Sequence, residues 1–380
     1  MTSGAGPAAN RGELTAVDDG AAARRTRAAD TPVFRCQVRD DVLAAVSEFL
    51  DSRCAPALEG SRVDIAAEVL RGLLADGKCL RSTYLYLGWL CGAEPGRAAV
   101  RAAASLEFLH AFALMQDDVM DSSPLRRGRP SAHRALEHWY LRRGLSGSAA
   151  RFGESAAVLL GDLCLVWAEQ MLRESGLDDA ALARAWPRYD AMRIELAVGQ
   201  FADLVNDTAV FPSLDEVLDV ARRKSGNYTV RRPLEIGATL AGCDDQVLAA
   251  LGGYGEAVGE AFQLRDDLLG VFGSPETTGK PAGTDLAARK ATTVVVAAHQ
   301  LATAAQRRQL CRLMTADRLT PADIAGWQTL IADIGTVEWI EHLIDQRLKR
   351  ALDRLAAAPL NSDAHSALAG MAAACTKRDT

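Results

Sequence analysis

The sequence predicts an all-α fold, a helical bundle built around a central cavity. From about Asp40 onward the chain is rich in Ala, Leu, Arg and Glu, and its apolar residues recur at three- and four-residue spacing. Alternating runs of β-branched residues, which are typical of strands, are few. Residues 102–115 and 155–167 carry almost no charge, which predicts two helices inside the bundle.

Clusters of glycine, proline and serine divide the chain into about ten predicted helical segments. The predicted breaks are Gly92–Gly96, Ser122–Pro124, Gly144–Gly147, Ser175–Gly176, Phe211–Ser213, Gly242 and Gly273–Gly283. We find no internal repeat and no long Pro- or Ser-rich linker. We therefore expect one domain over residues 36–360, with a disordered tail at residues 1–35 and a second tail at residues 361–380.

The composition is that of a soluble globular protein, with 49% hydrophobic and 24% charged residues. A net charge of −6 argues against a nucleic-acid binder, which normally carries a basic face. The eight cysteines are scattered without a C-x-x-C pair, so we expect reduced thiols in a cytoplasmic protein. No uncharged apolar run of about 18 residues is present, so no transmembrane segment is expected.

Three carboxylates, Asp117, Asp118 and Asp121, directly follow the apolar stretch 102–115. Asp117 and Asp121 share one helix face. Like charges at this spacing cost about 0.2–0.5 kcal/mol unless a cation compensates them. Magnesium takes oxygen ligands and is typically held by one or two carboxylates together with substrate phosphates. The cluster therefore predicts a magnesium site, and an exposed acidic helix end is the alternative.

A second pair, Asp266 and Asp267, follows another apolar helical stretch at residues 257–264. Two buried helices that both end in aspartates predict facing walls of a cavity, where metal sites of helical bundles are built.

Basic residues lie next to glycines at several points of the chain. They include Lys78 with Arg81, Arg126 with Arg127, Lys224, and Lys280 with Lys290. A single basic pair is usually a surface feature, but guanidinium groups bind phosphate oxygens in two-pronged fashion. Combined with two aspartate clusters, these cations predict a site for diphosphates, whose charge both magnesium and Lys/Arg would offset.

Taken in order, these motifs resemble those of the trans-isoprenyl diphosphate synthases (polyprenyl synthetase family), and most closely the geranylgeranyl diphosphate synthases. The resemblance runs from about Lys78 to Thr293. It rests on Gln116-Asp-Asp-Val-Met-Asp121 with Arg126-Arg127-Gly128, Gly199-Gln-Phe-Ala-Asp203-Leu204, Lys224-Ser-Gly-Asn-Tyr-Thr-Val230, Phe262-Gln-Leu-Arg-Asp-Asp267 and Thr278-Gly-Lys-Pro-Ala-Gly-Thr-Asp-Leu286. It implies an isoprenoid-synthase-type helical bundle, a homodimer, and the substrates isopentenyl diphosphate and an allylic diphosphate.

The resemblance also implies a role for individual residues. Asp117, Asp121 and Asp266 ligate three magnesium ions, and the catalytic set is these three with Asp118, Arg126 and Lys224. The allylic diphosphate is held by Arg126, Lys224 and Lys280, and the isopentenyl diphosphate by Lys78, Arg81, His110 and Arg127. Ser225, Gln263 and Lys290 also contact substrate, and Gln200, Asp203 and Asp267 support the site. Without the resemblance, His110 would be interpreted as a core histidine.

The chain departs from the family pattern at two motifs. The usual Gly-Gly-Lys-Arg-x-Arg-Pro appears as Asp76-Gly-Lys-Cys79-Leu-Arg-Ser82, which keeps Lys78 and Arg81. The second aspartate motif ends in Gly270, where many members carry another aspartate. Because Asp266 is retained, we expect activity.

Helix geometry gives a hypothesis for product length. If the allylic diphosphate sits at Asp117, its tail runs back past Ala113, Phe112 and Leu109. Phe112 stands about 7.5 Å and Leu109 about 12 Å behind Asp117. An aromatic floor at Phe112 is similar to one geranylgeranyl-type pattern and favours a C20 product. Ordinary core packing of Phe112 is the alternative, and the same chemistry with a C15 or longer product stays open.

Two other functions are considered. A class I terpene cyclase should carry a second metal motif of the N-D-x-x-S-x-x-x-E kind, whereas Asn206-Asp207 continues as Thr-Ala-Val-Phe. A non-catalytic partner subunit would explain Cys79, Ser82 and Gly270 but has no chemical need for the retained Asp and Arg residues. The sequence leaves open whether dimethylallyl, geranyl or farnesyl diphosphate is the preferred primer.

Overall fold

The chain folds almost entirely into helices. The computed structural model describes residues 31–59, 64–206, 211–274 and 282–376. Within these ranges the only sheet is the antiparallel hairpin of β1 (Leu125–Arg126) and β2 (Arg129–Pro130), with Arg126 opposite Arg129. The all-α prediction is confirmed.

The helices of the first half are α2 (Thr31–Phe49), η1 (Leu50–Cys54), α3 (Ala55–Leu58), α4 (Asp64–Leu74), α5 (Leu80–Leu90), α6 (Arg97–Met120), α7 (Ala132–Arg142), α8 (Ala149–Arg173) and α9 (Asp179–Asn206). Those of the second half are α10 (Leu214–Val220), η2 (Ala221–Arg231), α11 (Arg232–Leu240), α12 (Asp245–Phe272), α14 (Thr284–Ala287), α15 (Thr293–Leu301), α16 (Ala304–Met314), α17 (Pro321–Asp333), α18 (Thr336–Ala356) and α19 (Ser362–Thr376). The described residues of every predicted break lie between helices. The ends of α15 to α18 were not anticipated.

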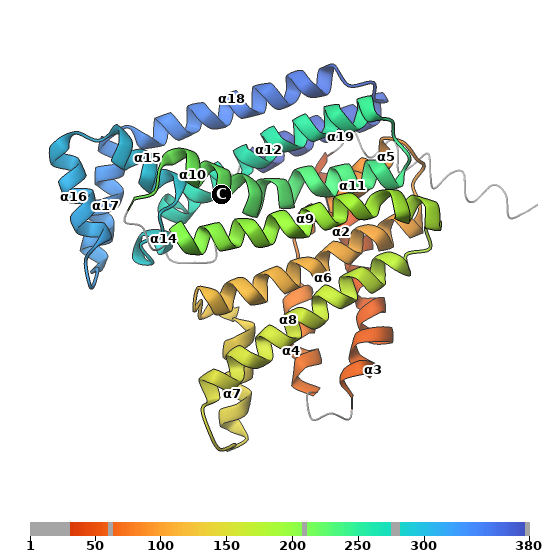
Figure 1. The fold of residues 1–380 in the computed structure, drawn as a ribbon, viewed down its shortest axis with the longest axis horizontal. Helices are drawn as coiled ribbons and strands as arrows, with labels where there is room; N and C mark the ends of the chain where they lie inside the picture. The colour runs from red at the N-terminus through yellow and green to blue at the C-terminus, as the bar shows by residue number, and fades with distance from the viewer. Residues whose placement is uncertain (1–30, 60–63, 207–210, 275–281, 377–380) are drawn as a thin grey trace, which may run out of the picture.

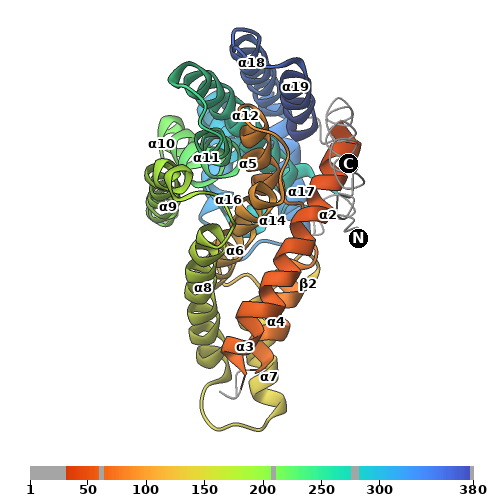
Figure 2. The ribbon, with the colours of Figure 1, turned by 90° about the vertical axis from the view of Figure 1, so that its right-hand side faces the viewer.

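The long helices run alongside one another and form the body of the molecule. In Figure 1, α6, α9, α11, α12 and α18 cross the view in roughly the same direction, while α7 and part of α8 extend below them. Figure 2 shows α2 and α4 along one side of this body, with α8 across from them. The closest-packed pairs include α6 with α8, α12 with α18, and α11 with α5.

Two hydrophobic cores are joined by α12. The larger core surrounds α6, where Leu106, Phe108 and Leu109 are fully buried. The smaller core lies among α15, α17 and α18. The first part of α12 packs into the larger core and its last turns into the smaller one. The expectation of a single domain over residues 36–360 stays a prediction.

The C-terminal residues are not a tail as far as residue 376. In α19 an apolar face packs into the larger core, and Met371 is fully buried. The hydroxyl of Tyr254 donates a 2.6 Å hydrogen bond to the carbonyl of Leu368. The prediction of a tail over residues 361–380 is therefore wrong for α19. At the other end, the prediction of a tail is wrong for residues 31–35, because α2 begins at Thr31 and Phe34 is buried in the larger core. Residues 1–30 of the predicted tail lie outside the described residues.

Two helices, α6 and α8, are long and apolar enough to cross a membrane by length and composition alone. The relevant windows are 67% buried in α6 and 44% buried in α8. Core helices of helical bundles meet the same criterion, so this finding is weak evidence for a membrane span.

Glycines allow α5 and α11 to cross in backbone contact. A Cβ added at Gly237 would lie 2.8 Å from the amide nitrogen of Trp89 and would overlap the carbonyl of Leu85. A Cβ at Gly88 would meet the backbone of α11 in the same way. This crossing fixes the position of α5, whose first turn carries Arg81.

We predict that Gly237→Ala lowers the free energy of unfolding by about 1–3 kcal/mol, because the methyl group forces two packed backbones apart. The matched control is Gly72→Ala on α4, where an added Cβ meets no atom within 4 Å. That substitution should raise stability by about 0.5–1 kcal/mol through helix propensity. Denaturant unfolding measures both, and equal effects would contradict the close crossing.

Candidate active site

The end of α6 carries the first aspartate cluster into a half-buried position. Asp117 and Asp121 lie one turn apart, with side chains 25% and 12% exposed, whereas Asp118 points inward and is 2% exposed. Carboxylates at a helix C-terminus are disfavoured by the helix dipole, and partial burial adds a desolvation cost. Cations must therefore lie close by.

The β1–β2 hairpin brings one of those cations to the cluster. Arg127 and Gly128 occupy the tip with φ of 53° and 74°. A two-residue hairpin turn of type I′ requires this left-handed conformation at both positions. The Nε of Arg126 donates hydrogen bonds to both carboxylate oxygens of Asp118, at 3.0 and 3.2 Å. The same guanidinium group lies 3.3 Å from Asp117. Asp118 thus positions Arg126. Burial raises the pKa of Asp118, although Arg126 opposes the shift.

The π-helix η2 brings the second cation. The ammonium group of Lys224 lies 3.2 Å from Asp117 and 2.6 Å from Asp203, and Ser225 beside it is half-buried. This approach depends on Gly199 of α9, where a Cβ would come 2.7 Å from the backbone nitrogen of Lys224. Burial opposes ionisation of Asp117, yet Lys224, Arg126 and Lys290 hold its pKa below the usual value.

A third cation, Lys290, forms an ion pair with Asp121 and lies three residues before Thr293, which contacts the second aspartate motif. Asp267 accepts hydrogen bonds from Gln263 at 2.7 Å and from the backbone N–H of Thr293 at 3.1 Å. Asp267 and Gln263 therefore tie α12 to the first residue of α15. Burial raises the pKa of Asp267 to about 7. Asp266 is half-buried on α12, while Lys280 lies outside the described residues.

A second group of cations surrounds His110. Arg81 donates a 3.0 Å hydrogen bond to the hydroxyl of Thr229, and its guanidinium lies 4.3 Å from the centre of the Tyr228 ring. The rings of His110 and Tyr228 are 6.2 Å apart. Burial, reinforced by Arg81, Arg127 and Arg126, holds the pKa of His110 well below its usual value, so the imidazole is neutral.

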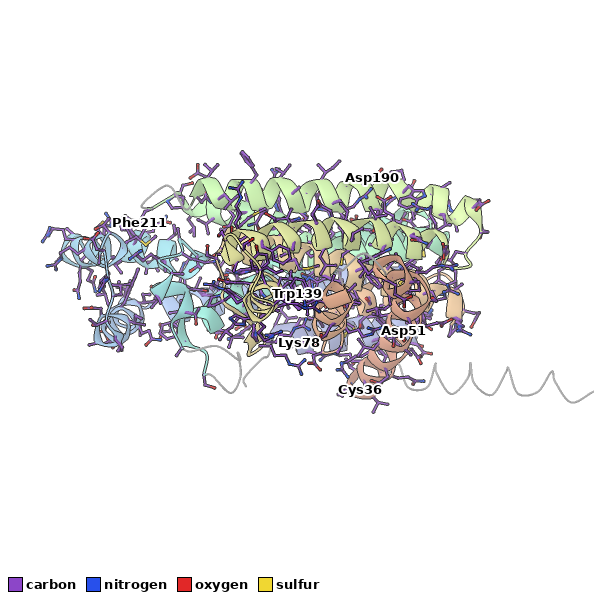
Figure 3. All side chains as sticks on the ribbon, turned by 90° about the horizontal axis from the view of Figure 1, so that it is seen from below. Cys36, Asp51, Lys78, Trp139, Asp190 and Phe211 are labelled. Carbon is purple, nitrogen blue, oxygen red and sulfur yellow. The ribbon has the colours of Figure 1, made fainter. Side chains whose placement is uncertain are left out.

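This second group has unused hydrogen-bonding capacity. Arg81 Nε and His110 Nδ1 are buried and have no hydrogen-bond partner in the described part of the chain. Arg127 extends from the hairpin toward the same region, where it donates to the carbonyl of Leu73. Lys78 is exposed, and Figure 3 shows it near the middle of the molecule, away from the end marked by Phe211. The unsatisfied, buried N–H of Arg81 beside further cations suits an anionic ligand.

An apolar cavity of about 680 Å³ opens beside Asp117 and runs between α6, α8 and α9. Phe112 and Ala113 line it, as do Gln200 and Met120, which contact each other at 3.7 Å. Leu109 does not line it, because its side chain is fully buried in the larger core. The prediction that Leu109 contributes to chain length is therefore not supported. A cavity of about 520 Å³ between α2, α5 and α19 contains none of the aspartate motifs.

Several contacts of the site were not anticipated from the sequence. Tyr228 and Thr229 belong to a motif that was singled out only for Lys224 and Ser225, and Glu107 lies one turn before His110 on α6. Asp285 fills the space left by Gly270. A Cβ added at Gly270 would overlap one carboxylate oxygen of Asp285 and lie 2.7 Å from its Cγ. A carboxylate thus stands where the family's last aspartate would begin, but it comes from α14.

Comparisons with known proteins show which family the chain resembles. The polyprenyl synthetase family model matches residues 63–330. Geranylgeranyl diphosphate synthase of Mycobacterium tuberculosis is 33% identical over 283 residues, 74% of this chain and 75% of the relative. Geranylfarnesyl diphosphate synthase of Aeropyrum pernix is 31% identical over 290 residues, 75% of this chain and 85% of the relative.

A similar solved structure is geranylgeranyl pyrophosphate synthase from Corynebacterium glutamicum, complexed with isoprenyl diphosphate and magnesium. The TM-score is 0.86 at 36% identity, over 90% of this chain and 99% of that chain. A decaprenyl diphosphate synthase from Rhodobacter capsulatus has a TM-score of 0.75 at 26% identity, over 91% and 98% of the chains.

We predict that Gly270→Asp lowers the free energy of unfolding by about 1–3 kcal/mol, because the new side chain and Asp285 compete for one space and carry like charges. Adding Asp285→Ala should recover much of that loss, which denaturant unfolding of the two single variants and the double variant measures. Strictly additive losses would show that the two positions do not interact.

Proposed function

Because this chain belongs to the polyprenyl synthetase family, we propose that it joins isopentenyl diphosphate head-to-tail to an allylic diphosphate and makes geranylgeranyl diphosphate (C20). The observation that carries the proposal is the position of the apolar cavity, which opens directly beside Asp117 and its cations. A diphosphate can bind at the charged end while its isoprenoid tail extends into the cavity.

The carboxylates suit magnesium as a cofactor. In the described ranges no group of three or more His, Cys, Asp or Glu side chains forms a complete metal site. Magnesium is commonly held by one or two carboxylates together with substrate phosphates, which matches Asp117, Asp121 and Asp266. Three ions per site is the number we propose from the family resemblance. Bound there, magnesium offsets the charge of the allylic diphosphate as it leaves.

The residues of this chain then position the two substrates relative to each other. We assign the allylic diphosphate to Arg126, Lys224 and Lys280, and the isopentenyl diphosphate to Lys78, Arg81, His110 and Arg127. The C–O bond of the allylic diphosphate breaks, the isopentenyl double bond attacks the resulting carbocation, and a proton passes to the released pyrophosphate. Positioning and charge stabilisation account for this catalysis, so no nucleophilic side chain is needed.

The competing functions have less support. A non-catalytic partner subunit would not need the ion network of Asp117, Asp121, Arg126 and Lys224. A terpene cyclase is disfavoured by the missing second metal motif, although Asp207 of the partial match lies outside the described residues.

We also propose a cytoplasmic location. All eight cysteines are free, which supports a reducing compartment. We propose neither a nucleic-acid partner nor a transmembrane segment.

The proposed function is tested by incubating the protein with magnesium, labelled isopentenyl diphosphate and each of dimethylallyl, geranyl and farnesyl diphosphate, and then measuring product length after dephosphorylation. A C20 alcohol supports the proposal. A C15 or longer linear product retains the chemistry and overturns the C20 assignment, whereas no incorporation with any primer favours the partner subunit.

We predict that Phe112→Ala lengthens the product by one or more isoprene units, because the ring lines the cavity and its removal extends the space for the tail. Leu109→Ala is the matched control on the same helix, since Leu109 is buried in the core. That control should leave chain length unchanged and lower stability by about 2–5 kcal/mol. If Phe112→Ala gives an unchanged product with the same primers, the hypothesis that the Phe112 ring limits chain length is refuted.

We also propose a homodimer. Leu159, Leu163 and Val166 form an exposed apolar stripe on α8, and Ile194, Val198, Phe201 and Val205 form another on α9. Phe201 is 72% exposed, although it lines the cavity. The helices are neighbours, tied by the ion pair of Arg193 with Glu169. Two exposed apolar stripes on helices that border the same cavity are well suited to burial against a second copy.

Phe201→Asp should convert the dimer to a monomer, because it places a charge within this patch. Light scattering coupled to gel filtration measures the mass. Leu352→Asp on α18 is the control, since Leu352 is also an exposed apolar residue but lies outside the two stripes. A wild-type protein that elutes as a monomer would contradict the proposal.

A further inference from the structure

A buried carboxylate lies beneath the loop that joins α4 to α5. Glu107 of α6 is 6% exposed and accepts a 2.6 Å hydrogen bond from the hydroxyl of Ser82. A Cβ added at Gly77 would lie 3.1 Å from the other carboxylate oxygen, so the loop backbone passes directly against Glu107. Glu107 therefore contacts both ends of the segment 77–82, which carries Lys78 and Arg81.

The position of Glu107 is energetically costly. Burial raises its pKa, although Ser82, Arg81 and Arg127 favour the charged form. Its short hydrogen bond comes from the neutral hydroxyl of Ser82 and not from a cation. A buried carboxylate with one short hydrogen bond does not improve an apolar core. The role of Glu107 is therefore to hold the loop 77–82 in place.

The loop needs such support. Cys79 has a φ of 48°, a left-handed conformation that is unfavourable for a residue other than glycine. Arg39 donates a 2.9 Å hydrogen bond to the carbonyl of Gly77, and the hydroxyl of Thr83 donates one of 2.7 Å to the carbonyl of Cys79. Together with Glu107, these contacts fix a strained backbone between two substrate-binding cations.

Two of the three residues that depart from the family pattern in this loop, Cys79 and Ser82, meet at Glu107, whereas the third, Asp76, lies 3.4 Å from Arg129. Ser82 stands where the pattern has proline, and its hydroxyl supplies the short hydrogen bond. Cys79 stands where the pattern has arginine, and its thiol lies against the same carboxylate, which together with burial raises the pKa of that thiol. The two departures are thus parts of one contact and leave the loop attached to α6.

We propose that Glu107 is a positioning residue for the isopentenyl diphosphate site, acting through Ser82 and the Gly77 backbone to hold Lys78 and Arg81 in register with His110. It does not itself touch the substrate. Because Glu107, His110 and Asp117 all lie on α6, the same helix then sets the distance between the two diphosphate sites. The inference rests on the proposed function and concerns only one of its two substrates.

The test compares steady-state kinetics of Ser82→Ala, Glu107→Gln and Glu107→Ala with wild type, varying each substrate in turn. Ser82→Ala and Glu107→Ala should raise the KM for isopentenyl diphosphate about 5- to 20-fold, as loss of a buried hydrogen bond to a charged group predicts. The KM for the allylic diphosphate should stay within about two-fold. Glu107→Gln should change less, since its amide oxygen can still accept from Ser82.

The matched control is Ser105→Ala. Ser105 is fully buried on the same helix, and its hydroxyl donates a 2.6 Å hydrogen bond to the carbonyl of Ala102 instead of the loop. It should lose similar stability in thermal unfolding and leave both KM values unchanged. If Glu107→Ala does not fold, Ser82→Ala carries the test because it removes a single hydroxyl.

Three results would overturn the inference: unchanged KM values in folded variants, equal rises in both KM values, or a lower KM for isopentenyl diphosphate. The last would mean that the carboxylate only repels the diphosphate. If wild type itself shows no turnover, the proposed function fails separately. Calorimetric binding of isopentenyl diphosphate to the same variants then decides the inference, with weaker binding expected for Ser82→Ala and not for Ser105→Ala.

Discussion

The charge balance at the C-terminal end of α6 is the constraint on which the rest of the structure depends. The helix dipole, mutual repulsion and partial burial all act against carboxylates at this position. Cations from three separate elements offset them: Arg126 from the hairpin, Lys224 from η2 and Lys290 after α14. These elements are distant in sequence, so the network also determines how the helices around α6 are arranged.

The same network explains how such a site can bind a diphosphate. Lys224 and Lys290 hold pKa values above their usual range because Asp117, Asp203 and Asp121 outweigh the effect of burial. Both side chains therefore stay charged and can exchange carboxylate partners for phosphate oxygens. The carboxylates that they release become available to a divalent cation. The ion pairs thus stabilise the half-buried carboxylates of the site.

At Gly270, Ser82 and Cys79, where the chain departs from the family pattern, neighbouring residues make specific contacts. Gly270 leaves space that the carboxylate of Asp285 fills from α14, and Ser82 with Cys79 packs onto Glu107. Neither change removes charge from the contacts of Asp117, Asp121 and their cations. Asp285 thus supplies a carboxylate at Gly270, whereas Ser82 and Cys79 gain a contact with Glu107 that does not replace the charge of the pattern's arginine.

The sequence by itself determined the helical class, the breaks between most helices, and the aspartate and cation motifs, because periodicity, turn residues and short motifs are local properties. The separate roles of Asp117 and Asp118, the exclusion of Leu109 from the cavity wall, and the packing of α19 were decided only by tertiary structure. Each depends on which neighbour a side chain meets, and residues such as Asp285, Glu107 and Thr229 become neighbours of the site only when distant helices pack together. A single sequence contains no signal for contacts of that range.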